Sequence, residues 1–264
     1  MFKNALRKAF TEIGGIALVG SLSKILHPPS GWRPKQAGVI TPKEFQTLLM
    51  RLDLKDKDPV LVARDQCMLW MCYGSAFRAV EVAGWLIKEA LYPNGQLCAM
   101  TRIRAAATKG SLPTIAPVVV HQQRNALEAW LNLRLEKSIM ATTSKRYRGL
   151  NPDSPVFPRF YAGAWGHWAP TRKVSKGKDY LVFTNLQTHL SKLHQHFGFP
   201  QCSSHSGRRS VTDALRRKQV DQETIQGVLG HTCIESQLVY SDLDLVAFDA
   251  AHQNIYQTKA PIKI

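Results

Sequence analysis

Four side chains near the C-terminal end of the sequence have the chemistry to attack a phosphodiester without a metal ion. His205 lies three residues before Arg208, His231 follows Arg208 by 23 residues, and Tyr240 comes nine residues later. A guanidinium can hold the non-bridging oxygens of a phosphate with paired N–H groups. Imidazoles can hydrogen-bond the phosphate or move protons, and a phenol can be the nucleophile. The spacing therefore indicates phosphoryl transfer to a tyrosine.

The charge of the chain is strongly positive. Its 264 residues include 35 Lys and Arg against 19 Asp and Glu, a formal net charge of +16. An apolar content of 44% supports a folded core. A folded protein with this charge is typical of nucleic-acid binding. Charge that serves only solubility, or basic ribosomal-type packaging, is the alternative, but it explains none of the spacing above.

Cysteine usage and hydropathy indicate a reducing compartment without a membrane anchor. The five cysteines are odd in number and scattered, with no paired framework. Cys202, His205, His231 and Cys233 could ligate zinc, but no C-x-x-C or H-x-x-x-H pattern organises them, so we expect no metal. The apolar run at 13–20 is too short to span a membrane. We therefore expect a cytoplasmic protein that does not contact a membrane.

Most elements that must position these residues are expected to be helices. Thr41-Pro42-Lys43-Glu44 combines an N-cap threonine, a proline at the first helical position and an acidic first turn. Between 91 and 120 the pattern changes to strand, with Thr108-Lys109-Gly110-Ser111 at a hairpin turn. The predicted fold class is mainly α with a small antiparallel β-sheet (α+β). We expect helices from Pro42, from Pro59 to Cys72, around Arg78 to Val82, from His121 to about Met140, and from Asn185 almost to Asp249, with breaks at 198–200, 220–221 and Gly230.

The chain is expected to divide into a short appendage and one large domain. Residues 1–40 look like an appendage that ends in a linker at 27–32. Residues 41–264 form the large domain. Within it, residues 141–180 show no clear period, which indicates an irregular insertion around a short strand at Pro155-Val156-Phe157.

Several motifs in one order resemble those of the tyrosine recombinases, also called the phage integrase family. His205-Ser206-Gly207-Arg208, Leu229-Gly230-His231 and Tyr240 are similar to its H-x-L-R, L-G-H and tyrosine signature. Gly74 to Val82 resembles its G-x-R-x-x-E box with one extra residue, and Ala107-Thr108-Lys109-Gly110 resembles its lysine-bearing hairpin. The resemblance covers roughly residues 41–250, so it implies a tyrosine recombinase catalytic-domain-like fold.

The resemblance also assigns roles to two arginines and a carboxylate. Arg78 and Arg208 would hold the scissile phosphate from two sides and stabilise the charge of its transition state. Glu81 would orient Arg78. A surface arginine paired with Glu81 is the ordinary alternative for Arg78.

The remaining catalytic roles fall on four residues. Tyr240 would attack phosphorus and leave a covalent 3′-phosphotyrosyl link, without metal, nucleotide or other cofactor. Lys109 would protonate the departing 5′ oxygen. His205 and His231 would hydrogen-bond the phosphate or take the proton of Tyr240. Gly230 would end a helix in the left-handed conformation, so that the imidazole of His231 points into the site.

The function that the resemblance implies is site-specific recombination of double-stranded DNA, as in the integration, excision or inversion of a mobile element. A homotetramer on DNA would exchange the C-terminal tail that follows Tyr240. A catalytically inactive DNA-binding accessory protein and a type IB topoisomerase-like activity are the alternatives. Candidates for contacts to the DNA backbone are Arg102, Arg104, Arg209, Arg172 and Lys173.

Two departures from the family pattern carry expectations. Gly207 stands where the family usually has leucine, which would remove a packing contact beneath Arg208. About 40 residues precede the resemblance, too few for the helical core-binding domain of many members, so an accessory DNA-binding protein is a candidate partner.

Overall fold

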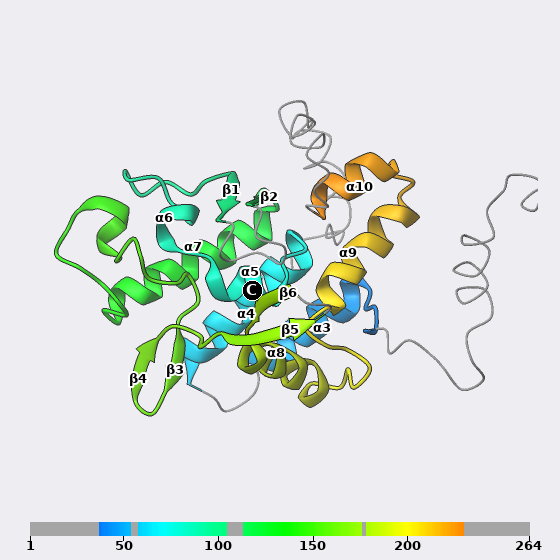
Figure 1. Cartoon of the computed structure of the whole chain (residues 1–264), viewed down its shortest axis with the longest axis horizontal. Helices are drawn as coiled ribbons and strands as arrows, with labels where there is room; N and C mark the ends of the chain where they lie inside the picture. The colour runs from blue at the N-terminus through cyan, green and yellow to red at the C-terminus, as the bar shows by residue number, and fades with distance from the viewer. Residues whose placement is uncertain (1–36, 54–57, 105–112, 176–177, 230–264) are drawn as a thin grey trace, which may run out of the picture. The chain divides into compact units, whose positions relative to one another are not determined.

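The computed structural model describes residues 37–53, 58–104, 113–175 and 178–229 (Figure 1). The chain divides into Met1–Gln36 and Ala37–Ile264, and all that follows concerns the second unit. The expected appendage lies outside the described residues except for its last four, and the tail after Tyr240 lies outside them entirely. Among the described residues, no helix combines the length and the apolar character needed to cross a membrane.

Helix α4 (Pro59–Gly74) is the centre of the described core, and it confirms the helix predicted over Pro59–Cys72. Asp58 caps its start by accepting from the backbone N–H of Val60 at 2.8 Å, and a proline at the first position suits a helix that needs no donor there. Every residue from Cys67 to Gly74 is buried. Three helices pack against α4 and bury it: α3 (Pro42–Asp53), α7 (His121–Glu136) and α9 (Ser206–Arg217).

The expected helix start at Pro42 and the expected breaks at 198–200 and 220–221 are confirmed. The hydroxyl of Thr41 and the carboxylate of Glu44 form the capping pair at the start of α3. Helix α8 (Thr184–His196) ends before the predicted break at 198–200, and α10 (Gln222–Val228) begins after the break at 220–221. The predicted continuation beyond Leu229 lies outside the described residues.

A hairpin of β1 (Met100–Ile103) and β2 (Thr114–Pro117) occupies the predicted strand region, with Met100 opposite Pro117 and Ile103 opposite Thr114. It packs on α6 (Ile87–Ala90), a short helix that was not predicted, and α6 follows α5 (Ala79–Gly84). The hydroxyl of Thr101 on β1 accepts from the Trp85 indole at 2.7 Å and donates to the Glu89 carbonyl at 2.6 Å. These bonds fix the base of the hairpin.

The segment 141–180 is more regular than expected. It contains a short turn (Arg146–Gly149) with left-handed backbone at Tyr147 and Arg148, and an antiparallel hairpin of β3 (Arg159–Tyr161) and β4 (Ala164–Gly166). A second hairpin begins inside it, with β5 (Thr171–Ser175) paired to β6 (Lys178–Val182). The described part of the chain thus holds three two-stranded sheets rather than one small sheet.

The predicted strand at Pro155-Val156-Phe157 is wrong. Pro155 makes only an isolated bridge with Leu86. The carbonyl of Val156 accepts from the Trp130 indole, and that of Phe157 accepts from the Trp168 indole, each at 2.8 Å. Side chains therefore satisfy the carbonyl groups that a strand would have paired with backbone.

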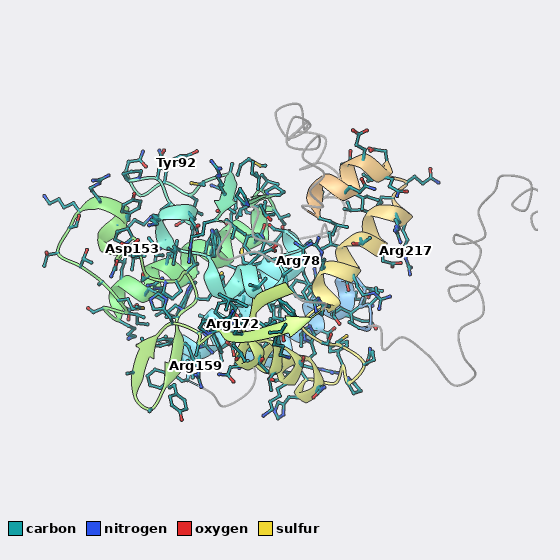
Figure 2. All side chains as sticks on the ribbon, viewed as in Figure 1. Arg78, Tyr92, Asp153, Arg159, Arg172 and Arg217 are labelled. Atoms are coloured by element: carbon teal, nitrogen blue, oxygen red, sulfur yellow. The ribbon has the colours of Figure 1, made fainter. Side chains whose placement is uncertain are left out.

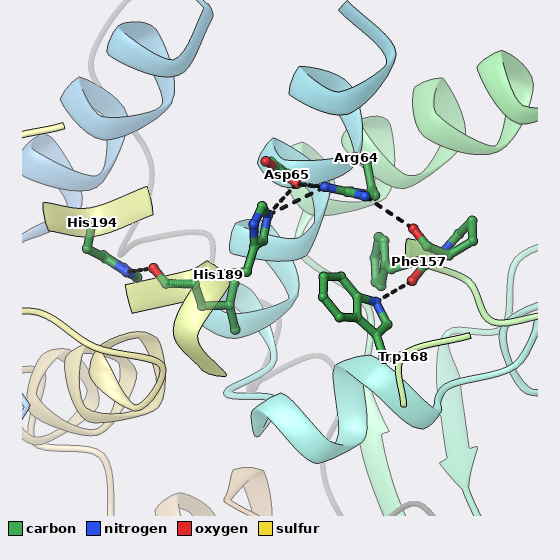
Figure 3. A network of polar contacts seen from close by, with 8 residues as sticks. Arg64, Asp65, Phe157, Trp168, His189 and His194 are labelled. Atoms are coloured by element: carbon green, nitrogen blue, oxygen red, sulfur yellow. Dashed lines mark hydrogen bonds and ion pairs between the residues drawn. The ribbon is translucent and has the colours of Figure 1, made fainter. Parts of the chain in front are cut away.

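A buried ionic cluster ties this segment to α4 and α8 (Figure 3). Arg64 donates to Asp65 at 2.8 Å and to the carbonyl of Pro158 at 3.3 Å. His189 on α8 donates from Nε2 to the same Asp65 oxygen at 2.9 Å, because an ionised carboxylate can only accept. Burial raises the pKa of Asp65, but the hydrogen bond from His189 and the Arg64 charge outweigh it, so the pKa lies below its usual value. The carboxylate stays ionised and the cluster stays paired at neutral pH.

Candidate active site

Arg208 lies in the first turn of α9, which packs closely against the end of α4. Gly207 allows the two helices to pack this closely, because a Cβ there would lie 2.7 Å from the Cβ, carbonyl carbon and carbonyl oxygen of Cys72. The expectation that Gly207 leaves a missing packing contact is therefore wrong, because the α4 backbone fills the space. The glycine brings α9 close to α4.

The Arg208 guanidinium joins two segments that are far apart in the sequence. Nη1 donates to the carbonyl of Ala76 at 3.0 Å, and Nη2 donates to the carbonyl of Leu229. Ala76 lies two residues before Arg78. Leu229 is the first residue of the Leu229-Gly230-His231 triplet and caps the C-terminus of α10. The motifs predicted to act together thus converge on one guanidinium.

Arg78 is held at the start of α5, on the side that faces α9 in Figure 2. The Glu81 carboxylate accepts from the Arg78 backbone N–H at 2.7 Å and from its Nη1 at 2.8 Å. The Glu81 side chain is 3% exposed, whereas that of Arg78 is 21% exposed. A buried carboxylate thus holds an arginine that still reaches the surface. Glu81 has the geometry expected of a residue that orients Arg78.

Cys72 beside this pair is unreactive by environment. Burial and the negative charge of Glu81 raise the pKa of its thiol to about 12. It is therefore a packing residue at neutral pH.

His205 is the N-cap residue of α9, one helical turn before Arg208, and its side chain is exposed. Its backbone N–H is 3.3 Å from the Ser203 hydroxyl, and its carbonyl accepts from the Arg209 N–H at 3.1 Å. An N-cap position places the imidazole at the start of the helix that carries Arg208. Lys109, Gly230, His231 and Tyr240 lie outside the described residues, so their predicted roles stay predictions.

The candidate DNA-contact residues differ in their surroundings. Arg102 is exposed on β1, whereas Arg104 pairs with Glu89 at 3.1 Å. Arg209 donates from Nη1 to the carbonyl of Ala37, which helps to fix the chain that enters α3. Arg172, labelled in Figure 2, and Lys173 are exposed on β5. Their contacts with DNA remain predictions, and the structure gives Arg104 and Arg209 intramolecular partners as well.

The sequence did not single out the two carbonyl groups that Arg208 binds, or the buried side chains behind Ala76. Backbone acceptors leave no signature in residue types. Gln123 on α7 gave no signal either, because a glutamine on a helix is usually exposed. Here it is fully buried and donates to Ser75 at 2.7 Å.

The guanidinium groups of Arg78 and Arg208 have the chemistry to bind an anion and to stabilise added negative charge. Two arginines come from segments joined by a hydrogen bond, and one of them is braced by a buried carboxylate. Guanidinium groups held in this way suit a phosphate whose charge grows in the transition state. This arrangement is compatible with the phosphate-binding roles predicted for Arg78 and Arg208, which stay predictions.

Comparisons with known proteins identify the family of this chain. The sequence profile of the phage integrase family matches residues 39–245. The chain therefore belongs to the phage integrase family, the family of the tyrosine-type DNA recombinases.

Among its relatives, the chain is 26% identical to the tyrosine recombinase XerC of Pseudomonas fluorescens over 239 residues, covering 88% of this chain and 68% of that protein. It is 27% identical to the XerC of Methylobacterium nodulans over 203 residues, covering 75% of this chain and 52% of that protein. The chain thus spans between about half and two thirds of the length of these relatives.

The fold is similar to that in the crystal structure of the XerA recombinase. The TM-score is 0.51 at 16% identity, and the match covers 88% of this chain and 68% of that one. The expected fold class is confirmed: a mainly helical domain with small antiparallel sheets.

Proposed function

We propose that this protein is a site-specific DNA recombinase that cleaves and rejoins strands through a covalent 3′-phosphotyrosyl intermediate. Tyr240 attacks the scissile phosphorus, Arg78 and Arg208 hold the non-bridging oxygens, and Lys109 protonates the 5′ oxygen as it leaves. His205 and His231 hydrogen-bond the phosphate or accept the tyrosine proton. The bond to Tyr240 keeps the energy of the phosphodiester, so rejoining needs neither metal nor nucleotide.

The observation that carries this proposal is the placement of Arg208. One guanidinium binds the carbonyl two residues before Arg78 and the carbonyl two residues before His231. A surface arginine that served only solubility would have no reason to join these two segments. Family membership over residues 39–245 supports the same chemistry.

The proposed substrate is double-stranded DNA. A net charge of +16 and exposed basic residues on β1 and β5 favour binding to a phosphate backbone. We further propose a homotetramer on DNA, with the tail after Tyr240 docked on a neighbouring copy, and a role in moving a mobile element. An accessory DNA-binding protein is a proposed partner.

The experiment that tests this function needs a target sequence, which selection from a pool of random duplexes supplies. A series of duplexes with the selected sequence is then prepared, each with a single nick at a different nucleotide position. A nick just 3′ of the scissile phosphate lets the short 5′-hydroxyl fragment escape, so the covalent complex accumulates. We expect a denaturant-stable protein–DNA adduct with one position of the nick.

Two other results would overturn the proposal in favour of the alternatives. Specific binding with no adduct at any nick position indicates an accessory DNA-binding protein. Relaxation of supercoiled DNA without strand exchange between two selected sites indicates a topoisomerase-like activity.

A further inference from the structure

A buried polar connection lies directly behind the turn that joins α4 to α5. Its two side chains are Ser75, at the C-terminal cap of α4, and Gln123, in the first turn of α7. We propose that Ser75 and Gln123 are positioning residues for strand cleavage, because they fix the turn whose Ala76 carbonyl receives the Arg208 guanidinium. This inference rests on the function proposed above and deepens it.

The hydrogen bonds form a donor-to-acceptor chain from Gln123 through Ser75 to Pro117. The side-chain nitrogen of Gln123 donates to the Ser75 hydroxyl at 2.7 Å and to the Trp70 carbonyl at 3.3 Å. The Ser75 hydroxyl donates in turn to the carbonyl of Pro117, the last residue of β2. Gln123 is 0% exposed and Ser75 is 2% exposed. Removing either side chain therefore leaves a buried polar group without its partner, which costs more than an exposed hydrogen bond would.

The turn itself needs such support. Ala76 has a φ of 55°, in the left-handed region that costs a residue with a side chain, and it is fully buried. Strained backbone of this kind persists only where its surroundings determine it. Here Phe77 donates its backbone N–H to the Met71 carbonyl at 3.2 Å, and Ser75 is tied to Pro117.

Gly74 lets Gln123 come this close. A Cβ at Gly74 would lie 2.8 Å from the side-chain carbonyl carbon of Gln123 and 2.9 Å from its nitrogen. The glutamine amide thus packs directly against the last turn of α4, and the absence of a side chain at Gly74 is what admits it.

A change in this turn would affect the positions of both Arg208 and Arg78. The carbonyl of Ala76 accepts from Arg208 at 3.0 Å, and Arg78 follows two residues later. If the turn relaxes, the Arg208 acceptor and the start of α5 move together. A misplacement of about 1 Å at a reacting centre can cost roughly 100-fold in rate.

A matched pair of serine variants tests the proposal. Ser154 is also buried, donates to a backbone carbonyl (Asn151, 2.7 Å) and accepts from a side-chain nitrogen (Arg134, 3.1 Å), but it supports the segment before β3. Ser75→Ala and Ser154→Ala therefore each remove a buried hydroxyl that accepts from one side-chain nitrogen and donates to one backbone carbonyl. The thermal unfolding of each purified full-length variant is measured first. The single-turnover cleavage rate on the nicked duplex is then measured at increasing protein concentration, which gives the rate at saturation and the protein concentration that gives half of that rate.

We expect Ser75→Ala to lower the saturated cleavage rate by about 10- to 100-fold, with a half-saturating concentration within about threefold of the wild-type value. Ser154→Ala should lose similar thermal stability and keep the wild-type rate below its unfolding transition. Equal cleavage rates in the two variants would overturn the positioning role of Ser75. The proposed function would still stand in that case, provided that the wild-type protein forms the adduct. A wild-type protein that forms no adduct would overturn both.

A second variant protects the test if Ser75→Ala does not fold. Gln123→Met keeps the length of the side chain but removes the donor to Ser75 and Trp70. We expect the same fall in saturated rate with unchanged half-saturation. A wild-type rate in a folded Gln123→Met protein would overturn the role of the glutamine.

Discussion

The Nη1 atom of Arg208 lies 3.0 Å from the carbonyl oxygen of Ala76, a residue 132 positions earlier in the chain. This bond connects the first turn of α9 to the turn before Arg78. Since Nη2 of the same guanidinium binds the Leu229 carbonyl, Arg208 fixes the relative placement of three motif segments. Its planar fork suits this task, because one side chain serves two acceptors and, in the proposed mechanism, also binds a phosphate.

Arg208→Lys should abolish most cleavage although the charge is kept. An ammonium cannot reproduce the paired geometry of a guanidinium, so we expect a fall of about 100- to 1,000-fold in the single-turnover cleavage rate, measured on the nicked duplex. Arg217→Lys is the matched control, since Arg217 lies on the same helix in an exposed pair with Asp213 at 2.8 Å. Equal rates in the two variants would show that Arg208 does not touch the reacting phosphate.

Gly207→Ala should destabilise the fold even though alanine favours helix. The added Cβ would meet the Cys72 backbone at 2.7 Å, and backbone cannot yield as a flexible side chain can. We expect the free energy of unfolding to fall by about 1–3 kcal/mol in urea titrations, more than the helix propensity of alanine returns.

Gly166→Ala is the control for this substitution, because a Cβ at Gly166 meets nothing within 4 Å. We expect it to change stability by less than about 0.5 kcal/mol. If both glycine variants unfold at the wild-type urea concentration, α9 does not pack against α4 as closely as described.

Asp65→Asn should weaken the fold in a way that depends on pH. The mutation leaves the buried Arg64 without a counter-charge, which costs about 3 kcal/mol of the free energy of unfolding near neutral pH. The folded pKa of Asp65 lies below its usual 3.8, so its contribution is complete above 3.8 and is lost as pH falls through the folded value.

The measurement compares urea unfolding of wild type and Asp65→Asn from pH 7 down to about pH 3, a range that crosses the usual Asp pKa. Other carboxylates titrate in both proteins, so only the difference reports on Asp65. The difference should be constant above pH 5 and shrink below about pH 4. A difference that grows as the pH falls would mean that the carboxyl is already protonated in the folded protein.

Arg102→Ala should reduce DNA affinity more than Arg104→Ala. Arg102 is exposed on β1, whereas the guanidinium of Arg104 is partly neutralised by Glu89 at 3.1 Å. If Arg102 contacts a phosphate, its loss lowers the slope of log affinity against log salt by about 1. Binding titrations between low and moderate salt measure that slope. An unchanged slope for Arg102→Ala would remove β1 from the DNA-contact surface.

The parts of the fold with local signals could be predicted from the sequence. Thr41 before Pro42 places a helix start, because a capping side chain and a proline act within one turn. The segment around Val156 could not be predicted. Its three apolar residues resemble a strand, but the carbonyl groups of Val156 and Phe157 are bound by the indoles of Trp130 and Trp168, and Trp130 lies 26 residues from Val156 in the sequence.

The candidate site also has a part that could be predicted from the sequence and a part that could not. Spacing pointed to Arg208, and the resemblance to family motifs pointed to Arg78 and Glu81, because charged side chains in a fixed order are visible in the sequence. The groups that hold them were not visible. Ala76 and Leu229 act through backbone oxygens, and Gln123 meets Ser75 only after α7 packs on α4. Gly207 was misread because the neighbour that requires a glycine, Cys72, lies on another helix.

Tryptic mapping of the protein–DNA adduct by mass spectrometry tests the central claim most directly. The nicked duplex is incubated with the wild-type protein, the adduct is digested with trypsin and nuclease, and the peptide that carries the nucleotide is identified. We predict a 3′-phosphate ester on Tyr240, and no adduct from Tyr240→Phe at equal DNA binding. An adduct on another residue, or one that survives in Tyr240→Phe, would contradict the account.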